Sequence, residues 1–182
     1  GSHASVNDPW YVDLSKTYPY DPDKAKQLLA DAGQSDLELT MIVPPTPYAQ
    51  AISQLAVSEL ADIGVKLNLE QVDFPKWIDQ VFLNADYELS VISHVEARDI
   101  NQYGNPDYYW RYNDPQTQQL LQQADAETDE AKSNELYQQV QQRISDQAVN
   151  VFLYLLPRLQ VVQKGIAGFP EHTYSLSFDV TN

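Results

Sequence analysis

The 182-residue sequence contains no cysteine, which excludes disulfide bridges and thiolate metal sites. Basic residues are also scarce, because 11 lysines and arginines stand against 26 acidic residues, for a formal net charge of -15. Nucleic acids and anionic membranes bind basic surfaces, so this balance argues against both as partners. No apolar run approaches the roughly 20 residues that a membrane-spanning helix needs. With 43% hydrophobic residues, the chain can still bury a substantial core as one domain.

The first residues look foreign to the rest of the chain. Gly1, Ser2 and His3 resemble the remnant of a cleaved expression tag, so we assign residues 1–4 to a tag and expect no function for His3. The sequence shows no signal peptide. We expect residues 5–182 to form a single α/β domain that is a fragment of a larger protein.

Helix and strand signals alternate through the first half of the chain. Asp21 and Pro22 are typical of a helix start, and Gly33 is typical of a helix end. The spacing of apolar residues predicts helices over residues 21–32, 48–63 and 74–83, and strands over residues 37–43, 65–69 and 87–93. Strands joined through helices run parallel with right-handed crossovers. The sequence therefore predicts an α/β fold, with a mostly parallel or mixed sheet and helices on both faces.

The second half predicts two glutamine-rich helices followed by strands. Apolar residues at helical spacing mark the two helices: Leu120, Leu121 and Ala124, then Leu136, Val140 and Ile144. Their glutamines, Gln141 among them, are interpreted as a solvated face. The apolar run over residues 150–156 predicts a buried strand, and alternation over residues 158–163 predicts another.

Residues 94–115 lie between the two halves and show no regular period. A loop of about twenty residues in a compact domain is usually functional or disordered, and the many aromatic residues here argue against disorder. Aromatic faces give rigid contact area, and charges orient a small polar ligand. Ligands of parallel sheets bind beyond the carboxyl ends of the strands, which adds the loop after the first strand. The predicted ligand-binding residues are His94, Glu96, Arg98, Asp99, Tyr103, Tyr108, Tyr109, Trp110 and Tyr48.

Alternative roles stay open for these side chains. Arg98 either clamps a ligand carboxylate or pairs with Glu96 or Asp99. The tyrosines either stack on the ligand or pack the loop onto the sheet. His94, Glu96 and Asp99 have the chemistry of metal ligands, but no second histidine lies nearby in the sequence. We therefore expect solvated or ion-paired charges, and neither a metal nor a cofactor.

Catalysis finds little support in the sequence. It has no G-x-S-x-G turn, no glycine-rich phosphate loop and no H-E-x-x-H motif. The acidic residues form no pair that stands out as a general acid and base. We expect a binding protein and not an enzyme.

Several segments, taken in order, resemble one protein family. They are YPYDPDKAKQLLADAG over residues 18–33, LADIGV over 60–65, ADYEL over 85–89, PDYYWRYNDP over 106–115 and ELYQQVQQRI over 135–144. Together they resemble extracytoplasmic solute-binding proteins of the peptide/nickel type, which supply ABC importers. The resemblance covers most of residues 18–169.

The resemblance implies one lobe of a two-lobe receptor. Family members close two lobes on a solute, and this chain matches only the carboxyl-proximal lobe. In many peptide binders of the family, an aspartate after the third strand of this lobe pairs with the amino group of the ligand. Asp99 is the nearest candidate here, although residues 94–99 depart from the usual pattern.

The resemblance also implies a function and a location. We expect a monomeric receptor that captures a small solute, peptide-like or similar, by lobe closure and delivers it to the permease of an ABC importer. It would be extracytoplasmic, either periplasmic or a cell-surface lipoprotein, with signal and anchor absent from this fragment. Two alternatives remain: the ligand-sensing domain of a regulator with the same fold and, less favoured, a small hydrolase.

Overall fold

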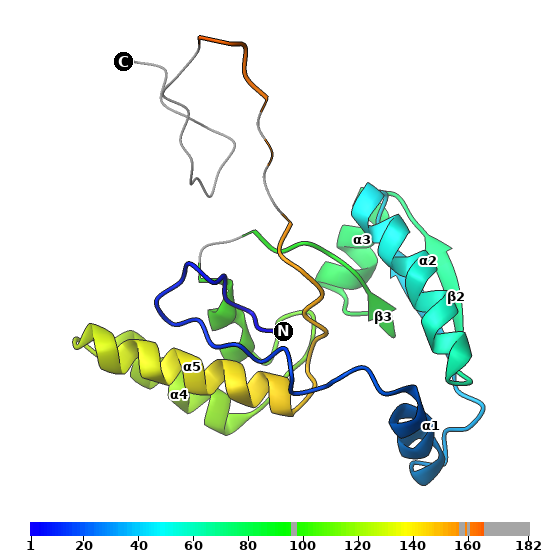
Figure 1. Ribbon diagram of the computed structural model, residues 1–182, viewed down its shortest axis with the longest axis horizontal. Coiled ribbons are helices and arrows are strands. Elements are labelled where there is room, and N and C mark those ends of the chain that lie inside the picture. Colours follow the sequence, from blue (N-terminus) through cyan, green and yellow to red (C-terminus); the bar gives the residue numbers. More distant parts are fainter. Residues whose placement is uncertain (96–97, 157–158, 160, 166–182) are drawn as a thin grey trace.

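A computed structural model describes residues 1–95, 98–156, 159 and 161–165, so Glu96 of the predicted site lies outside the described residues. Figure 1 shows the sheet with α2 and α3 on one side of the molecule and the pair α4–α5 on the other. The elements are α1 (Pro22–Asp31), β1 (Glu38–Val43), α2 (Pro47–Asp62), β2 (Lys66–Gln71), α3 (Phe74–Trp77), the π-helix η1 (Ile78–Leu83), β3 (Leu89–Ser90), the 3-10 helix η2 (Asp99–Gly104), α4 (Pro115–Ala126) and α5 (Glu130–Asp146).

Aspartate side chains set the starts of four of these helices. Asp21, Asp73, Asp114 and Asp129 each accept a hydrogen bond from a backbone N–H two or three residues further on, at the starts of α1, α3, α4 and α5. In α1, α3 and α4 a proline lies in the first turn, where its missing N–H removes no helical hydrogen bond. These local signals explain why the helix starts could be predicted from the sequence.

The sheet has the order β2-β1-β3, and both pairings are parallel, as predicted. Met41 of β1 lies opposite Leu69 of β2 and Leu89 of β3. Because all three strands run the same way, their carboxyl ends meet at one edge. The loops that follow β1 and β3 therefore start from the same rim.

Helices cover both faces of the sheet, which confirms the predicted layering. On one face Met41 and Val43 of β1 pack with Ala49 of α2. On the other face Ile42 packs with Trp77 of α3. The Trp77 indole Nε1 donates to Ser90 Oγ at 2.9 Å, and that hydroxyl donates to the Ile42 carbonyl at 2.8 Å. These two bonds tie α3 to the central strand and to β3.

The strand predicted over residues 150–156 was wrong. These residues follow α5 without joining the described sheet, and Val151, Leu153 and Leu156 are 83%, 52% and 58% exposed. An apolar run indicates a surface that needs a partner, and it does not by itself specify a strand pairing. Of the second predicted strand, residues 158 and 160 lie outside the described residues, and residues 161–163 belong to no strand.

The helices α4 and α5 pack as the apolar spacing predicted. Leu121 and Ala124 of α4 share a buried cluster with Val140 and Ile144 of α5. Gln141 corrects the prediction of a fully solvated glutamine face, because it is 1% exposed. Its amide bonds backbone groups near the amino terminus, which lie far from α5 in the sequence.

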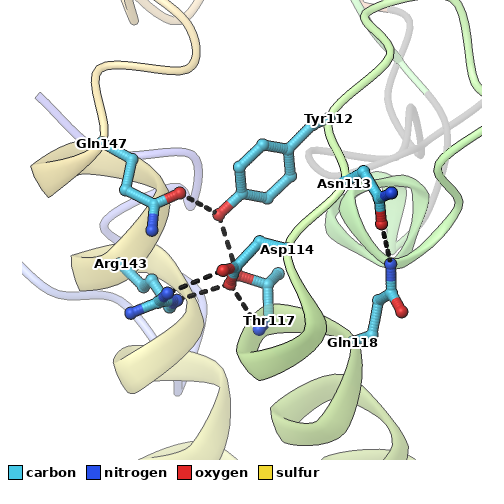
Figure 2. Close-up of polar contacts among 7 residues, drawn as sticks. All are labelled: Tyr112, Asn113, Asp114, Thr117, Gln118, Arg143 and Gln147. Carbon is cyan, nitrogen blue, oxygen red and sulfur yellow. Dashed lines mark hydrogen bonds and ion pairs between the residues drawn. The ribbon is translucent and has the colours of Figure 1, made fainter.

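A polar network fastens the end of the central loop to both helices (Figure 2). Arg143 of α5 donates from Nε to Asp114 Oδ2 at 2.5 Å and from Nη2 to Oδ1 at 2.7 Å. Asp114 also caps α4 by accepting from the Thr117 backbone N–H at 2.7 Å. The Tyr112 hydroxyl bonds Thr117 Oγ1 at 2.9 Å and donates to Gln147 Oε1 at 2.7 Å. One carboxylate thus links the loop, the start of α4 and the end of α5.

This network generates a prediction about stability. Asparagine caps a helix about as well as aspartate, so Asp114→Asn removes mainly the charge-assisted bonds to Arg143 and should lower the free energy of unfolding by about 1.5–3 kcal/mol. Asp114→Ala also removes the cap and should cost about 1 kcal/mol more. Urea denaturation followed by tryptophan fluorescence measures both. Asp107→Asn is the matched control, because the Asp107–Arg111 pair is 3.7 Å long and the Asp107 side chain is 92% exposed.

The same pair predicts an acid dependence. Arg143 holds the pKa of Asp114 well below its usual range through its hydrogen bonds. The stabilisation is therefore complete above the unfolded-chain pKa of about 3.9 and declines as the pH falls toward the folded pKa. The stability difference between the parent protein and Asp114→Asn should shrink below about pH 4. A difference that is constant from pH 7 to pH 3 would contradict this account.

Candidate functional site

The candidate site begins where the loops after β1 and β3 meet. The Tyr48 hydroxyl, at the start of α2, accepts a hydrogen bond from the Ser93 backbone N–H at 2.9 Å. This bond joins the two loops that the sequence assigned to one rim of the sheet. It also brings Tyr48 to the base of the stretch that contains His94.

His94 lies at the centre of the site. Its Nε2 is 2.6 Å from the Tyr109 hydroxyl, and its ring stacks on the Tyr109 ring at 5.8 Å with an interplanar angle of 8°. Its Nδ1 is 3.0 Å from Asp99 Oδ2. The two side chains thus lie within ion-pair distance of each other. The imidazole therefore bridges an aromatic hydroxyl and a carboxylate from opposite ends of the loop.

Asp99 is the buried charge of the site. It opens η2 and is 7% exposed, although it is a carboxylate. The preceding Arg98 adopts a left-handed backbone with φ of 55°, which a residue with a side chain rarely adopts and which the surrounding structure must impose. Asp99 Oδ1 is buried and has no hydrogen-bond partner among the described residues. A buried acceptor in this state is costly unless a further group binds it.

Arg98 does not pair with Asp99 in the described structure. Its side chain is exposed, and among the described residues it forms no ion pair with a carboxylate. One of the roles left open by the sequence, a pair between Arg98 and Asp99, is thus not found. The role of Glu96 stays a prediction, because Glu96 lies outside the described residues.

The aromatic residues divide into two groups. Tyr103 and Tyr109 are 1% and 8% exposed, and burial raises the pKa of each hydroxyl above its usual range. These two rings pack the loop into the molecule. Tyr108 and Trp110 are half-buried, with ring centroids 4.4 Å apart, and Trp110 also stacks on Tyr103 at 4.5 Å. The outer pair therefore offers the ring surface that a ligand could reach.

A second buried polar atom lies in the same cluster. The indole Nε1 of Trp110 is buried and has no hydrogen-bond partner among the described residues. The Trp110 ring is 5.5 Å from the His94 ring, which in turn faces Asp99. The described part of the site thus includes an unused acceptor, Asp99 Oδ1, and an unused donor, Trp110 Nε1. Such a pair suits a ligand that carries both an N–H group and a carbonyl or carboxylate.

Sequence reasoning missed the residues behind the loop. Asn150 Nδ2 donates to the Tyr103 hydroxyl at 2.6 Å, and Trp10 and Phe152 pack against the cluster that contains Tyr103. His3, assigned to a tag, lies between these rings. No spacing rule links residues about 50 or more positions apart, so only the scarcity of tryptophan, three in the chain, could have drawn attention to Trp10.

Neither a metal-binding cluster nor a membrane-spanning helix is found in the described residues. Within residues 1–95, 98–156, 159 and 161–165, no three side chains of histidine, aspartate or glutamate gather as they would around a metal ion. The helices in these ranges are also too short or too polar to cross a bilayer.

Comparison with known proteins places the chain. A family model described as bacterial extracellular solute-binding proteins, family 5 middle, matches residues 2–119. The chain is 28% identical to heme-binding protein A of Haemophilus influenzae, over 81% of this chain and 31% of that protein. It is 22% identical to the oligopeptide-binding protein AppA of Bacillus subtilis, over 94% of this chain and 36% of that protein. The chain thus spans about a third of the length of these relatives.

Solved structures show the same fold. The ABC transporter substrate-binding protein CtaP of Listeria monocytogenes matches with a TM-score of 0.71 and 24% identity, over 81% of this chain and 32% of that one. AppA of Bacillus subtilis, solved in complex with a nonapeptide, matches with a TM-score of 0.68 and 20% identity, over 80% of this chain and 33% of that one. The predicted lobe of a periplasmic-binding-protein fold is confirmed. Since the family model covers well over half of the sequence, the chain belongs to the bacterial extracellular solute-binding proteins of family 5.

Proposed function

We propose that this chain is one lobe of an ABC-importer receptor and that it captures a peptide-like solute by closing against a second lobe. Family membership and the relatives support this assignment, since AppA is an oligopeptide-binding protein and was solved with a nonapeptide. The observation that carries the choice of solute is the buried Asp99 Oδ1, which has no partner among the described residues.

Asp99 is the group that binds the amino end of the solute. An ammonium group is a donor that carries the opposite charge, so it satisfies the free oxygen and offsets the cost of burying the carboxylate. Trp110 Nε1, the unused donor of the same cluster, binds a carbonyl or carboxylate oxygen of the solute. Together the two atoms recognise the polar backbone that all peptides share.

His94 and Tyr109 are positioning residues. The imidazole contacts Asp99 Oδ2 at 3.0 Å, and Oδ1 is left without a partner among the described residues. Tyr109 Oη lies 2.6 Å from His94 Nε2 and orients the imidazole, and Tyr109 itself packs against the sheet. Arg98, exposed beside Asp99, is available to the carboxylate of a short peptide, and Tyr48 borders the same rim. Glu96, which lies outside the described residues, stays a candidate from the sequence. This role needs no catalytic group and no cofactor.

Family membership supports a setting outside the cytoplasm. Members of the family are described as extracellular, so the receptor works outside the cytoplasm as a periplasmic or surface-anchored protein, and its partner is the permease of an ABC importer. The net charge of -15 favours the approach of solutes with a positive amino end. The receptor acts as a monomer that delivers one solute at a time.

The first test of this proposal is a double-mutant cycle that combines one substitution in the protein with one chemical change in the solute. In the intact two-lobe receptor, Asp99→Asn should weaken binding of a free dipeptide such as Ala-Ala by about 1–3 kcal/mol, because it removes the charged partner of the ammonium group. Acetylating the dipeptide should cost the parent receptor a similar amount but cost the Asp99→Asn variant little. Isothermal titration calorimetry measures all four affinities.

The control for this cycle is Asp107→Asn, which removes an exposed charge from the same loop and should leave the affinity unchanged. Arg98→Ala should weaken binding of the free dipeptide by about 1–3 kcal/mol, and it should not affect a dipeptide amide that lacks the carboxylate. Equal losses on acetylation in the parent and in Asp99→Asn would show that Asp99 does not bind the amino end.

A second test compares the lobe with the intact receptor. The 182-residue chain has its own buried clusters on both faces of the sheet and between α4 and α5, so it should unfold in one cooperative thermal transition. A solute held between two lobes has only part of its contacts here, and no closure excludes water. The lobe should therefore bind the same dipeptide about a thousandfold more weakly than the intact receptor. Affinities that agree within a few-fold would place the whole site in this lobe.

A further inference from the structure

An aromatic slot lies behind the central loop, and the side chain of His3 fills it. The His3 ring stacks on Trp10 with centroids 6.3 Å apart and an interplanar angle of 30°. It meets the edge of Tyr103 at 5.7 Å and 85°, and the edge of Phe152 at 5.9 Å and 84°. One stacked and two perpendicular neighbours are the arrangement that a planar ring prefers. The slot is therefore shaped for a flat side chain.

The walls of this slot are fixed by contacts that do not involve His3. Gln141 Nε2 of α5 donates to the Trp10 carbonyl at 2.6 Å, and Trp10 packs against Tyr137 at 5.5 Å. Tyr103 stacks on Trp110 and accepts a hydrogen bond from Asn150 at 2.6 Å. Because α5, η2 and the chain after α5 each hold one wall, the slot should persist without its occupant.

Histidine is a poor occupant of this slot. His3 Nδ1 is buried and finds no hydrogen-bond partner among the described residues. Burial lowers the pKa of the imidazole, and His94 lowers it further, although Asp99 and Asp8 act in the opposite direction. A ring without a buried nitrogen would keep the same aromatic contacts and avoid the cost of the unsatisfied atom. The chemistry of the slot thus favours an uncharged aromatic ring.

The slot is next to the proposed solute site. Tyr103 forms one wall of the slot and stacks on Trp110, whose Nε1 is one of the two unused polar atoms. Asp99 starts η2, the short helix that also carries Tyr103. A peptide whose amino end is at Asp99 could therefore place a side chain in the slot.

We propose that the slot between Trp10, Tyr103 and Phe152 is a side-chain subsite for an uncharged aromatic ring of a peptide solute, and that His3 occupies it as an internal substitute. The inference rests on the proposed function and names its preferred solute class: peptides with phenylalanine-like side chains. It also assigns a competing role to residues 1–4, which the sequence assigns to a tag.

Thermal unfolding of the 182-residue chain tests the preference for the ring. His3→Phe keeps the aromatic contacts and removes the unsatisfied nitrogen, so its Tm should rise by about 2–4 °C, whereas His3→Ala should lower it. Val6→Ala is the control, because Val6 is 69% exposed in the same segment. A His3→Phe variant with a Tm at or below that of the parent would overturn the preference for an uncharged ring.

Binding of N-acetyl-L-phenylalanine amide tests the subsite itself by ligand-observed NMR. His3→Ala vacates the slot and should bind this probe about tenfold more tightly than the parent, because the internal competitor is gone. His3→Phe fills the slot and should bind it no better than the parent. N-acetyl-L-alanine amide should not distinguish the three proteins. Equal affinity of His3→Ala and His3→Phe for the phenylalanine probe would overturn the proposal.

The probe separates this inference from the proposed function. Both of its ends are blocked, so it offers no ammonium group to Asp99 and no carboxylate to Arg98. A vacated slot that binds the probe would support the subsite even if Asp99→Asn left dipeptide affinity unchanged. Conversely, a slot that ignores the probe would overturn the subsite and leave the role of Asp99 intact.

Discussion

The site depends on one energetic constraint, which is the burial of the Asp99 carboxylate. A carboxylate that is 7% exposed must be compensated by nearby groups, and His94 Nδ1 at 3.0 Å is the closest such group in the described residues. His94 is itself held by Tyr109, which packs with Trp77 and Ile42 against the sheet. The position of a single charge is thus set by contacts that run back to the central strand.

The central loop thus connects the sheet to the helix pair α4 and α5. Its start is fixed through Tyr48, its middle packs on the sheet through Tyr109, and its last part is fixed to α4 and α5 through Asp114. Rigid attachment at both ends suits a receptor, because binding groups that are already ordered lose little entropy when the solute arrives. The unused atoms Asp99 Oδ1 and Trp110 Nε1 are therefore held in fixed positions inside this lobe.

Local signals in the sequence were sufficient to predict the starts of several helices and the parallel layering of the sheet. An aspartate followed by proline starts a helix for reasons that involve only neighbouring residues, and strands joined by helices have to run parallel. The contacts behind the site were not predictable in this way. Gln141 has the composition of a solvated face yet is buried against the chain near Trp10, and residues 150–156 are apolar yet extend without a sheet partner in the described structure. Both depend on which distant segments meet, and no local pattern records that.

The most direct test of the central claim is a crystal structure of the intact receptor with a free dipeptide bound. The account predicts that the ammonium nitrogen of the dipeptide lies within about 2.7–3.0 Å of Asp99 Oδ1 while His94 keeps its contact with Oδ2. A structure in which the ammonium group binds elsewhere, with Asp99 Oδ1 still lacking a partner or bonded only within the protein, would contradict it.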